Sequence, residues 1–468
     1  MTAEVRDTDV VVIGAGPVGE NVADRAVRGG LETVLVESEL VGGECSYWAC
    51  MPSKALLRTG AAERAARAAG VEGGRVDPGA VLRRRDGFAS GWDDSGQVDW
   101  VRSAGIGLLR GHARLAGERR VIVSGERGEV TLLARRAVVV ATGSAALVPD
   151  IPGLREAEPW TSREATSLKD VPRSVVIVGG GVVAAEAATF LSDLGAEVTL
   201  LARSSLLSAF EPFAGARVRD ALRDRGVTVR EDTEPRRVAR DDVGVRVELV
   251  DGTSIRTEEI VVATGRVPRT ADLGLEAVGI EPGGWLDVDD TLRVEGLDWL
   301  YAAGDVTHRA LLTHQGKYQA RAAGDVIAAR AQGQRTDDRR WGRHVATADH
   351  VAVPQVVFTD PEVASVGLTA REAEDRGIRI RVVDADLGGV AGAALLADGY
   401  AGRARAVVDE DRRVLVGVTF VGPGVGELVH AATIAIVGEV PIERLWHAVP
   451  AYPTISEVWL RLLEAYGL

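Results

Sequence analysis

The chain has 468 residues, which is too long for one ordinary domain and predicts about three. Hydrophobic residues make up 46% and charged residues 26%, as in a globular protein without a disordered arm. The formal net charge is −13 and basic residues are scattered among acidic ones, which excludes a nucleic-acid partner. Because neither a signal peptide nor an apolar run of about 18 residues is present, we expect a cytoplasmic protein with no membrane partner.

The first predicted elements form a dinucleotide-binding unit. An apolar strand over residues 9–13 precedes a helix over 20–28, and a second strand over 33–36 ends at Glu37. The turn before the helix carries a GxGxxG motif formed by Gly14, Gly16 and Gly19. Glycines permit the close approach of a pyrophosphate, the helix N-terminus holds the phosphates, and the acid binds a ribose hydroxyl. An ordinary glycine-rich turn is the alternative, but it leaves the position of Glu37 unexplained.

The two cysteines of the chain, Cys45 and Cys50, lie in one short segment, GGECSYWACMPSK, at residues 42–54. On an ideal α-helix, their Cα atoms would be roughly 8–9 Å apart, which is too far for a disulfide. The segment must therefore be distorted or lie in a loop. A helix predicted over 53–69 places Cys50 near a helix N-terminus, where the dipole and Lys54 favour its thiolate.

In a reducing compartment, such a cysteine pair is more often catalytic, redox-sensing or metal-binding than a structural disulfide. Two cysteines without a nearby histidine make a poor zinc centre, so we expect no metal. A purely structural disulfide remains the other alternative.

A second nucleotide-binding unit follows. A strand over 174–178 leads into a motif formed by Gly179, Gly181 and Ala184, and a helix then precedes a strand over 197–201. No carboxylate follows this strand, whereas Arg203 is placed to pair with a 2′-phosphate. The site therefore favours NADPH over NADH. The alternative is that Arg203 is only a solvated surface residue.

Two further strands end in Ala-Thr-Gly, and we expect each to close one nucleotide-binding segment. The strand over 138–140 precedes Thr142 and Gly143, and the strand over 260–262 precedes Gly265 and Arg266. An apolar strand that ends at Gly304 and Asp305 places a carboxylate where it can accept from a sugar hydroxyl. From about residue 346, we expect a third domain with β-rich segments at 351–358, 379–383, 404–408 and 414–420.

Together, these motifs resemble the pyridine nucleotide-disulfide oxidoreductases, which include glutathione reductase, dihydrolipoamide dehydrogenase and mercuric reductase. The resemblance spans essentially the whole chain and also rests on residues 263–268, 303–305 and 353–362. It implies an α/β fold with two Rossmann-like FAD- and NAD(P)-binding domains and a C-terminal α+β dimerisation domain. The implied boundaries are 1–150 with 273–345 for FAD, 151–272 for NAD(P)H and 346–468 for dimerisation, in a homodimer.

The resemblance also implies roles for single residues. Cys50 would face the flavin, Cys45 would meet the substrate, Lys54 would pair with Glu186 near the flavin, and Asp305 would hold the FAD ribitol. The other implied cofactor-binding residues are Gly14, Gly16, Gly19, Glu37, Gly43, Thr142, Gly143, Gly304, Gly179, Gly181, Ala184, Arg203, Gly265 and Arg266. Electrons would pass from NADPH to FAD, to the disulfide and then to a small-molecule acceptor.

The C-terminal segment departs from the family pattern. Disulfide-reducing members carry His-Pro-Thr-x-x-Glu, in which the histidine acts as a general acid from the partner subunit. Here Tyr452 takes the histidine position and Glu457 the glutamate position, while Pro450 stands where a second histidine is common and His447 is interpreted as structural. Because tyrosine, with a reference pKa near 10, is a poor proton shuttle, we expect neither lipoamide nor glutathione disulfide to be the substrate.

Three hypotheses follow. The first is a thiol-disulfide enzyme for an activated disulfide with a low-pKa leaving thiol. The second is an NADPH-dependent quinone or diaphorase-type reductase, or a protein like mercuric reductase, which Tyr452 and residues 201–204 resemble. No cysteine follows Cys50, however, so the sequence lacks the C-terminal pair that delivers the metal in that enzyme. The third is a redox-sensing flavoprotein. The bulky Tyr47 and Trp48 between the cysteines also differ from the small residues usual in the family.

Overall fold

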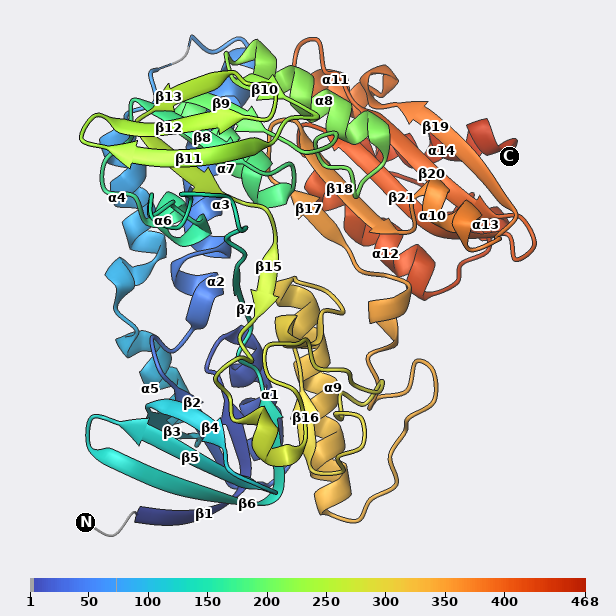
Figure 1. The fold of residues 1–468 in the computed structure, drawn as a ribbon. Coiled ribbons are helices and arrows are strands. Elements are labelled where there is room, and N and C mark those ends of the chain that lie inside the picture. Colours follow the sequence, from blue (N-terminus) through green and yellow to red (C-terminus); the bar gives the residue numbers. More distant parts are fainter. Residues whose placement is uncertain (1–3, 73) are drawn as a thin grey trace. The chain divides into compact units, whose positions relative to one another are not determined.

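The computed structural model describes residues 4–72 and 74–468 (Figure 1). It divides into two compact units, each assembled from separate stretches of the chain. The first unit covers Met1–Met51, Asp86–Ala145 and Arg266–Asp349, and the second covers Pro52–Arg85, Ala146–Gly265 and His350–Leu468. The finer domain boundaries drawn from the sequence stay a prediction.

The first unit is built on a largely parallel sheet with the strand order β3-β2-β1-β6-β5-β4, and β16 pairs with β6. Its strands are β1 (Glu4–Ile13), β2 (Thr33–Glu37), β3 (Gly107–Arg110), β4 (His112–Leu115), β5 (Arg120–Gly125), β6 (Gly128–Val140) and β16 (Leu300–Ala302). The central strand β1 pairs in parallel with both β2 and β6. Its residues Val10, Val11 and Val12 are completely buried, which explains a continuous apolar run in place of alternation.

Two helices of this unit, α1 (Pro17–Arg28) and α9 (Thr313–Ala331), pack tightly against each other. Glycines of α9 permit this approach, because a Cβ on Gly316 would lie 2.6 Å from Val18 Cγ2 and one on Gly324 would lie 2.4 Å from Arg25 Cβ. Residues of both helices share one apolar core with the sheet. The unit also contains α2 (Gly43–Tyr47), α5 (Ser95–Ser103) and the short paired strands β7 (Ser144–Ala146) and β15 (Arg266–Pro268).

The second unit repeats the same topology in a parallel sheet with the order β10-β9-β8-β14. The strands are β8 (Ser174–Val178), β9 (Glu197–Leu201), β10 (Thr228–Arg230) and β14 (Glu259–Val262). Both repeats place the strand before Ala-Thr-Gly directly beside the strand before the glycine motif. The two nucleotide-binding units expected from the sequence are therefore present. The helices around this sheet are α3 (Cys50–Ala68), α4 (Pro78–Phe88), α6 (Ser162–Ser167), α7 (Val182–Asp193) and α8 (Pro212–Asp224).

Two antiparallel sheets complete the second unit. One contains β11 (Pro235–Asp241), β12 (Gly244–Leu249) and β13 (Ser254–Thr257). The other has the order β17-β18-β21-β20-β19, with β17 (Gln355–Val357), β18 (Glu362–Gly367), β19 (Ile380–Asp386), β20 (Arg403–Asp409) and β21 (Val414–Gly422). The C-terminal helices are α10 (Ala370–Asp375), α11 (Ala391–Leu396), α12 (Val429–Val437), α13 (Ile442–Leu445) and α14 (Val458–Tyr466). The predicted α+β character of this region is thus confirmed, although β18 was not predicted.

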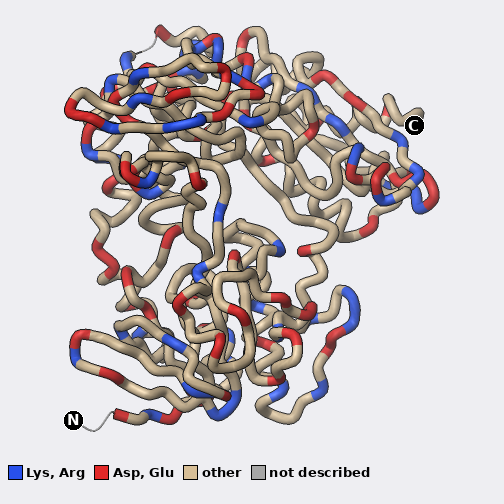
Figure 2. Tube along the Cα trace, in the orientation of Figure 1, with Lys and Arg blue, Asp and Glu red and all other residues tan. Residues whose placement is uncertain are grey.

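Acidic and basic side chains are interspersed along the described trace (Figure 2). Many of them form ion pairs, such as Arg379 with Asp411 and Arg403 with Asp384. The net negative charge is therefore spread over the chain and is not concentrated in one segment.

The first glycine of each nucleotide motif is sterically required. Gly179 has φ +140°, and a Cβ there would lie 2.2 Å from the Ala263 carbonyl oxygen. We predict that Gly179→Ala lowers the free energy of unfolding by about 1–3 kcal/mol, because the backbone must shift. Denaturant unfolding of the apoprotein measures this change. Gly181→Ala is the matched control, since a Cβ at this position would meet nothing within 4 Å, and equal stability of both variants would contradict the argument.

Candidate active site

The first nucleotide-binding turn lies between β1 and α1. Gly14 has φ +101°, and a Cβ there would lie 2.5 Å from the Ala141 carbonyl oxygen, so only glycine fits. The Ala15 N–H donates to the Glu37 carboxylate at 2.7 Å, which fixes this acid at the carboxyl end of β2. Among the described residues, no side chain caps α1 at Gly16. The first N–H groups of α1 are therefore available to an anionic group.

The Ala-Thr-Gly turn after β6 lies directly beside Gly14. The Thr142 hydroxyl is buried and has no hydrogen-bond partner among the described residues, and Gly143 has φ +70°. At the far side of the turn, a Cβ on Gly19 would lie 1.8 Å from the Gly14 carbonyl oxygen, so α1 could not pack with any larger residue there. An orphaned hydroxyl next to a glycine that lets the backbone come close is what a bound nucleotide would satisfy.

Asp305 lies directly after β16, where the sequence placed a sugar-binding carboxylate. Its Oδ2 accepts from the Ser144 hydroxyl at 2.5 Å, and Arg266 donates to the same hydroxyl at 2.5 Å. Gly304 takes φ +82° and donates its N–H to the Gln319 side chain at 2.7 Å, which holds the turn. Arg266 therefore supports the Asp305 turn of the first unit, a contact that its position after the second Ala-Thr-Gly did not reveal.

The cysteines lie in two separate helices. Cys45 is in α2, which ends at Tyr47, while Trp48 has a non-helical φ of −136° and Cys50 is the first residue of α3. The chain thus breaks between the cysteines, as their spacing required. Cys50 stands at the N-terminus of a helix of 19 residues, where the helix dipole favours a thiolate.

Thr313 and Lys317, both on α9, complete the surroundings of the cysteines. The Cys50 sulfur lies 3.3 Å from the Thr313 hydroxyl. A hydrogen bond to Cys50 raises the pKa of the Cys45 thiol, burial raises this pKa further, and Thr313 and Lys317 oppose the change. The protonated form of Cys45 is therefore favoured. Neither α9 residue was singled out for the site, although Lys317 is one of only three lysines in the sequence.

A second titratable group of this unit also escaped the sequence analysis. Glu20, in the first turn of α1, is 8% exposed, and its Oε1 has no hydrogen-bond partner among the described residues. Burial raises the pKa of Glu20 to about 7, Lys317 opposes this rise and Glu37 adds to it. The signal that could have found it is a charged residue directly after the glycine motif, where the helix packs on the sheet.

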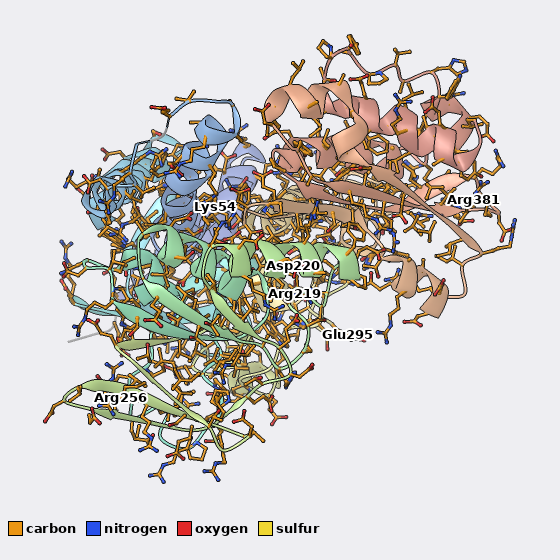
Figure 3. The ribbon with its side chains drawn as sticks, turned by 90° about the horizontal axis from the view of Figure 1, so that it is seen from above. Lys54, Arg219, Asp220, Arg256, Glu295 and Arg381 are labelled. Carbon is orange, nitrogen blue, oxygen red and sulfur yellow. The ribbon has the colours of Figure 1, made fainter. Side chains whose placement is uncertain are left out.

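Lys54 and Glu186 form the ion pair that the resemblance implied. The Lys54 Nζ donates to Glu186 Oε2 at 2.8 Å, and the Phe358 N–H donates to Glu186 Oε1 at 2.9 Å. The ammonium also lies 4.9 Å from the centre of the Phe358 ring, and Figure 3 shows Lys54 extending from its helix. Both carboxylate oxygens of the buried Glu186 are thereby hydrogen-bonded, and Lys54 is fixed in place.

The second nucleotide-binding turn resembles the first. Nothing lies within 4 Å of a Cβ placed on Gly181, which precedes α7, so this face of the turn is open to a ligand. Ala184 is completely buried, which shows that a methyl group fits where the motif usually has its third glycine. Gly265 follows β14 with φ +148°. These residues form the expected cradle together with Gly179.

Arg203 follows β9 and is 86% exposed on its side chain, so it is accessible to a ligand. Its Nε lies 3.8 Å from the Glu234 carboxylate, which comes from a different part of the chain. The sequence showed that no acid follows the strand, but it did not reveal this neighbour. A bound 2′-phosphate would thus compete with Glu234 for Arg203.

The C-terminal residues that replace the family's acid lie in the second unit. Tyr452 is 77% exposed. Glu457 ends the short 3₁₀ segment Ile455–Glu457, and its Oε2 is buried with no hydrogen-bond partner among the described residues.

Comparison with known proteins decides the family. The sequence model described as "Pyridine nucleotide-disulphide oxidoreductase" matches residues 8–333, and the one described as its dimerisation domain matches residues 353–462. The chain belongs to the pyridine nucleotide-disulfide oxidoreductases. It is therefore an oxidoreductase and a flavoprotein with a C-terminal dimerisation domain, as the resemblance implied.

Several curated members of this oxidoreductase family are similar over nearly the whole chain. Mercuric reductase from Shigella flexneri is 34% identical over 96% of this chain and 79% of its own length. Mercuric reductase from Staphylococcus aureus is 30% identical over 96% and 81%. Dihydrolipoyl dehydrogenase from Halobacterium salinarum is 32% identical over 98% and 96%. The relatives thus include enzymes with different substrates.

Solved structures show the same fold. The Cu(II) complex of the HOCl-induced flavoprotein disulfide reductase RclA from Escherichia coli has a TM-score of 0.85 at 23% identity, covering 98% of this chain and 99% of that one. LpdA from Mycobacterium tuberculosis has a TM-score of 0.84 at 23% identity, covering 98% and 100%. Among the described residues, no helix is long and apolar enough to cross a membrane.

Members of this oxidoreductase family are FAD-dependent and use NAD(P)H. The first cradle fits FAD, because it offers a close backbone approach at Gly14, an unpartnered Thr142 hydroxyl and the carboxylates of Glu37 and Asp305. These are the groups that a dinucleotide's pyrophosphate, ribose and polyol chain require.

Proposed function

We propose that this chain is an NADPH-preferring disulfide oxidoreductase that passes electrons through FAD to the Cys45–Cys50 pair and on to a small acceptor. The observation that carries the proposal is the position of the two cysteines. One opens a long helix beside Thr313, and the other is held nearby and protonated. When bound, FAD supplies the two-electron chemistry that links a nicotinamide to a disulfide.

The reduced cysteine pair shares one proton. Cys45 holds it because the neighbouring Cys50 carries negative charge, and the two sulfurs titrate together. Movement of this proton from Cys45 to Cys50 creates the Cys45 thiolate, which attacks a substrate disulfide and expels the first substrate thiolate. Cys50 then gives up its proton, which passes to a released thiolate, and attacks the Cys45 sulfur of the mixed disulfide. This step restores the Cys45–Cys50 bond and expels the second substrate thiolate.

The leaving thiol of the substrate determines which disulfides can react. Tyr452 replaces the histidine that protonates this thiol in other members, and a phenol is a weak acid at neutral pH. We therefore infer an acceptor whose leaving thiolate needs little protonation, namely an activated disulfide with a low-pKa thiol. Lys54, held by Glu186 one turn after Cys50 on α3, contributes a fixed positive charge.

A reductive titration tests the relay. Under strict anaerobiosis, we expect NADPH to deliver more electrons to the wild-type holoenzyme than the flavin alone accepts, with a long-wavelength band from a thiolate. Cys45→Ser should lose both the extra electrons and turnover with disulfides. If the wild type bleaches directly with no extra electrons, the cysteines are outside the electron path, and a quinone-type reductase becomes the better hypothesis.

NADPH preference rests on Arg203, which is exposed at the end of β9 where a 2′-phosphate would lie. A bidentate guanidinium contact to a phosphate is among the strong hydrogen-bonded pairs, while the nearby Glu234 weakens the attraction. We therefore expect a modest preference for NADPH over NADH.

We predict that Arg203→Glu lowers kcat/KM for NADPH by about tenfold to a hundredfold and leaves the value for NADH nearly unchanged. Glu234→Gln should shift the ratio in the opposite direction, because it frees Arg203. Steady-state kinetics with both nucleotides measures these values. A wild-type kcat/KM that is higher for NADH would refute the proposal.

We also propose a homodimer. The dimerisation domain leaves large apolar side chains exposed over its C-terminal part, namely Ile434, Val437, Trp446 and Val449. Exposed apolar side chains grouped in this way indicate a surface that another chain covers. The occupant we propose is the same domain of a second copy, as the matched domain's description indicates.

Light scattering of the purified enzyme should give twice the mass of one chain. Val449→Asp should produce monomers with much lower disulfide reductase activity, because a charge is expensive in an apolar interface. Val243→Asp is the matched control, since Val243 is a similarly exposed valine in the turn between β11 and β12. A fully active monomer would contradict the proposal.

A further inference from the structure

Glu20 is a buried acid of the first unit that the proposed mechanism leaves unused. It follows the last glycine of the nucleotide motif, and its Oε1 is enclosed without a hydrogen-bond partner among the described residues. A carboxylate in such a place is costly, whereas a neutral carboxyl group is not. The protonation state of the Glu20 carboxyl group therefore responds to changes in nearby charge.

Three neighbouring elements present titratable groups to Glu20. Lys317 comes from α9, Glu37 from β2 and Tyr47 from α2. Glu37 is already committed to the Ala15 N–H, and the Tyr47 hydroxyl donates to the Val41 carbonyl at 3.0 Å. On its own helix, the nearest acid is Asp24, which pairs with Arg28.

Lys317 is therefore the group that relates Glu20 to the redox chemistry. Its ammonium acts on the pKa of both Glu20 and Cys45. The close packing of Val18 on Gly316 fixes the spacing between α1 and α9, and so the position of Lys317 relative to Glu20. Lys317 therefore stabilises negative charge both on the cysteines and on the Glu20 carboxylate. A thiolate that forms on the cysteines offsets this positive charge and so favours the protonated form of Glu20.

Backbone contacts at Gly16 also connect Glu20 with α2, the helix that carries Cys45. A Cβ on Gly43, the first residue of α2, would lie 2.7 Å from the Gly16 Cα. The Glu20 N–H in turn donates to the Gly16 carbonyl at 3.0 Å. The distance between Glu20 and the cysteine helix is thereby fixed by backbone contacts.

We propose that Glu20 takes up a proton from solvent when the Cys45–Cys50 disulfide is reduced and releases it when the disulfide re-forms. The hydride of NADPH carries both electrons and one proton, which convert the disulfide into one thiol and one thiolate. The second proton binds the Glu20 carboxylate and offsets the thiolate charge. Reoxidation by a two-electron acceptor then returns both protons. Glu20 is thus a positioning residue for charge and does not touch the substrate.

This inference rests on the proposed function, since it requires the cysteines to be reduced. The test is an anaerobic titration of the weakly buffered holoenzyme with NADPH, in which a pH indicator reports protons and absorbance reports electrons. At pH 6.5, the wild type should take up a substantial fraction of a proton per NADPH during reduction of the disulfide, and Glu20→Gln about none. Asp24→Asn, one turn later on α1, is the matched control and should behave like the wild type.

The wild type alone provides a second readout. Its proton uptake should vanish above about pH 8.5, because the pKa of Glu20 is about 7 when both cysteines are free thiols and the carboxyl group then stays ionised even after reduction. Uptake that is as large at pH 8.5 as at pH 6.5, or unchanged in Glu20→Gln, would overturn the inference. If the cysteines accept no electrons in any variant, the proposed function has failed instead.

Discussion

The contact between two glycine backbones, Gly16 and Gly43, is the constraint on which the redox site depends. Gly43 has φ +58°, and no side chain fits between it and the Gly16 Cα. Gly16 is the N-cap of α1, whose first N–H groups are available to an anionic group, and Gly43 begins α2, which carries Cys45. Any larger residue at Gly43 would push the cysteine away from the cofactor cradle. The glycines of the two motifs therefore act as one structural element, although they are separated in the sequence.

Much of this architecture could be predicted from the sequence because local patterns determine it. The two glycine motifs, their following acid or arginine and the two Ala-Thr-Gly turns are each recognisable within about 30 residues, and the sheet topology follows from parallel pairing. The spacing of Cys45 and Cys50 similarly implied a break in the chain. The strand β18 was missed because it is short and contains the small residues Ala364 and Ser365, which weaken the strand pattern.

The missed site residues have a different cause. Thr313 contacts Cys50 although 263 residues separate them in the sequence, and Lys317 acts on both Cys45 and Glu20 through the packing of α9 on α1. Arg203 and Glu234, or Arg266 and Asp305, are likewise neighbours through tertiary structure alone. The positions of these charged residues follow no periodic pattern in the sequence, so their pairing could not be predicted from it. The substrate could not be predicted for the same reason, since the shape of its pocket depends on such packing.

The distribution of amines in this chain has a practical consequence. Arginine supplies nearly all of the positive charge, and lysine occurs only at positions 54, 169 and 317. Lys169 is exposed, whereas Lys54 is held by Glu186 and Lys317 is partly buried near Cys45. Among the lysine side chains, acylating agents and amine cross-linkers therefore find one surface target, Lys169, and otherwise only the two lysines near the cysteines. In a Lys169→Arg variant, lysine modification would report on the surroundings of the cysteine pair and not, as in most proteins, on the surface.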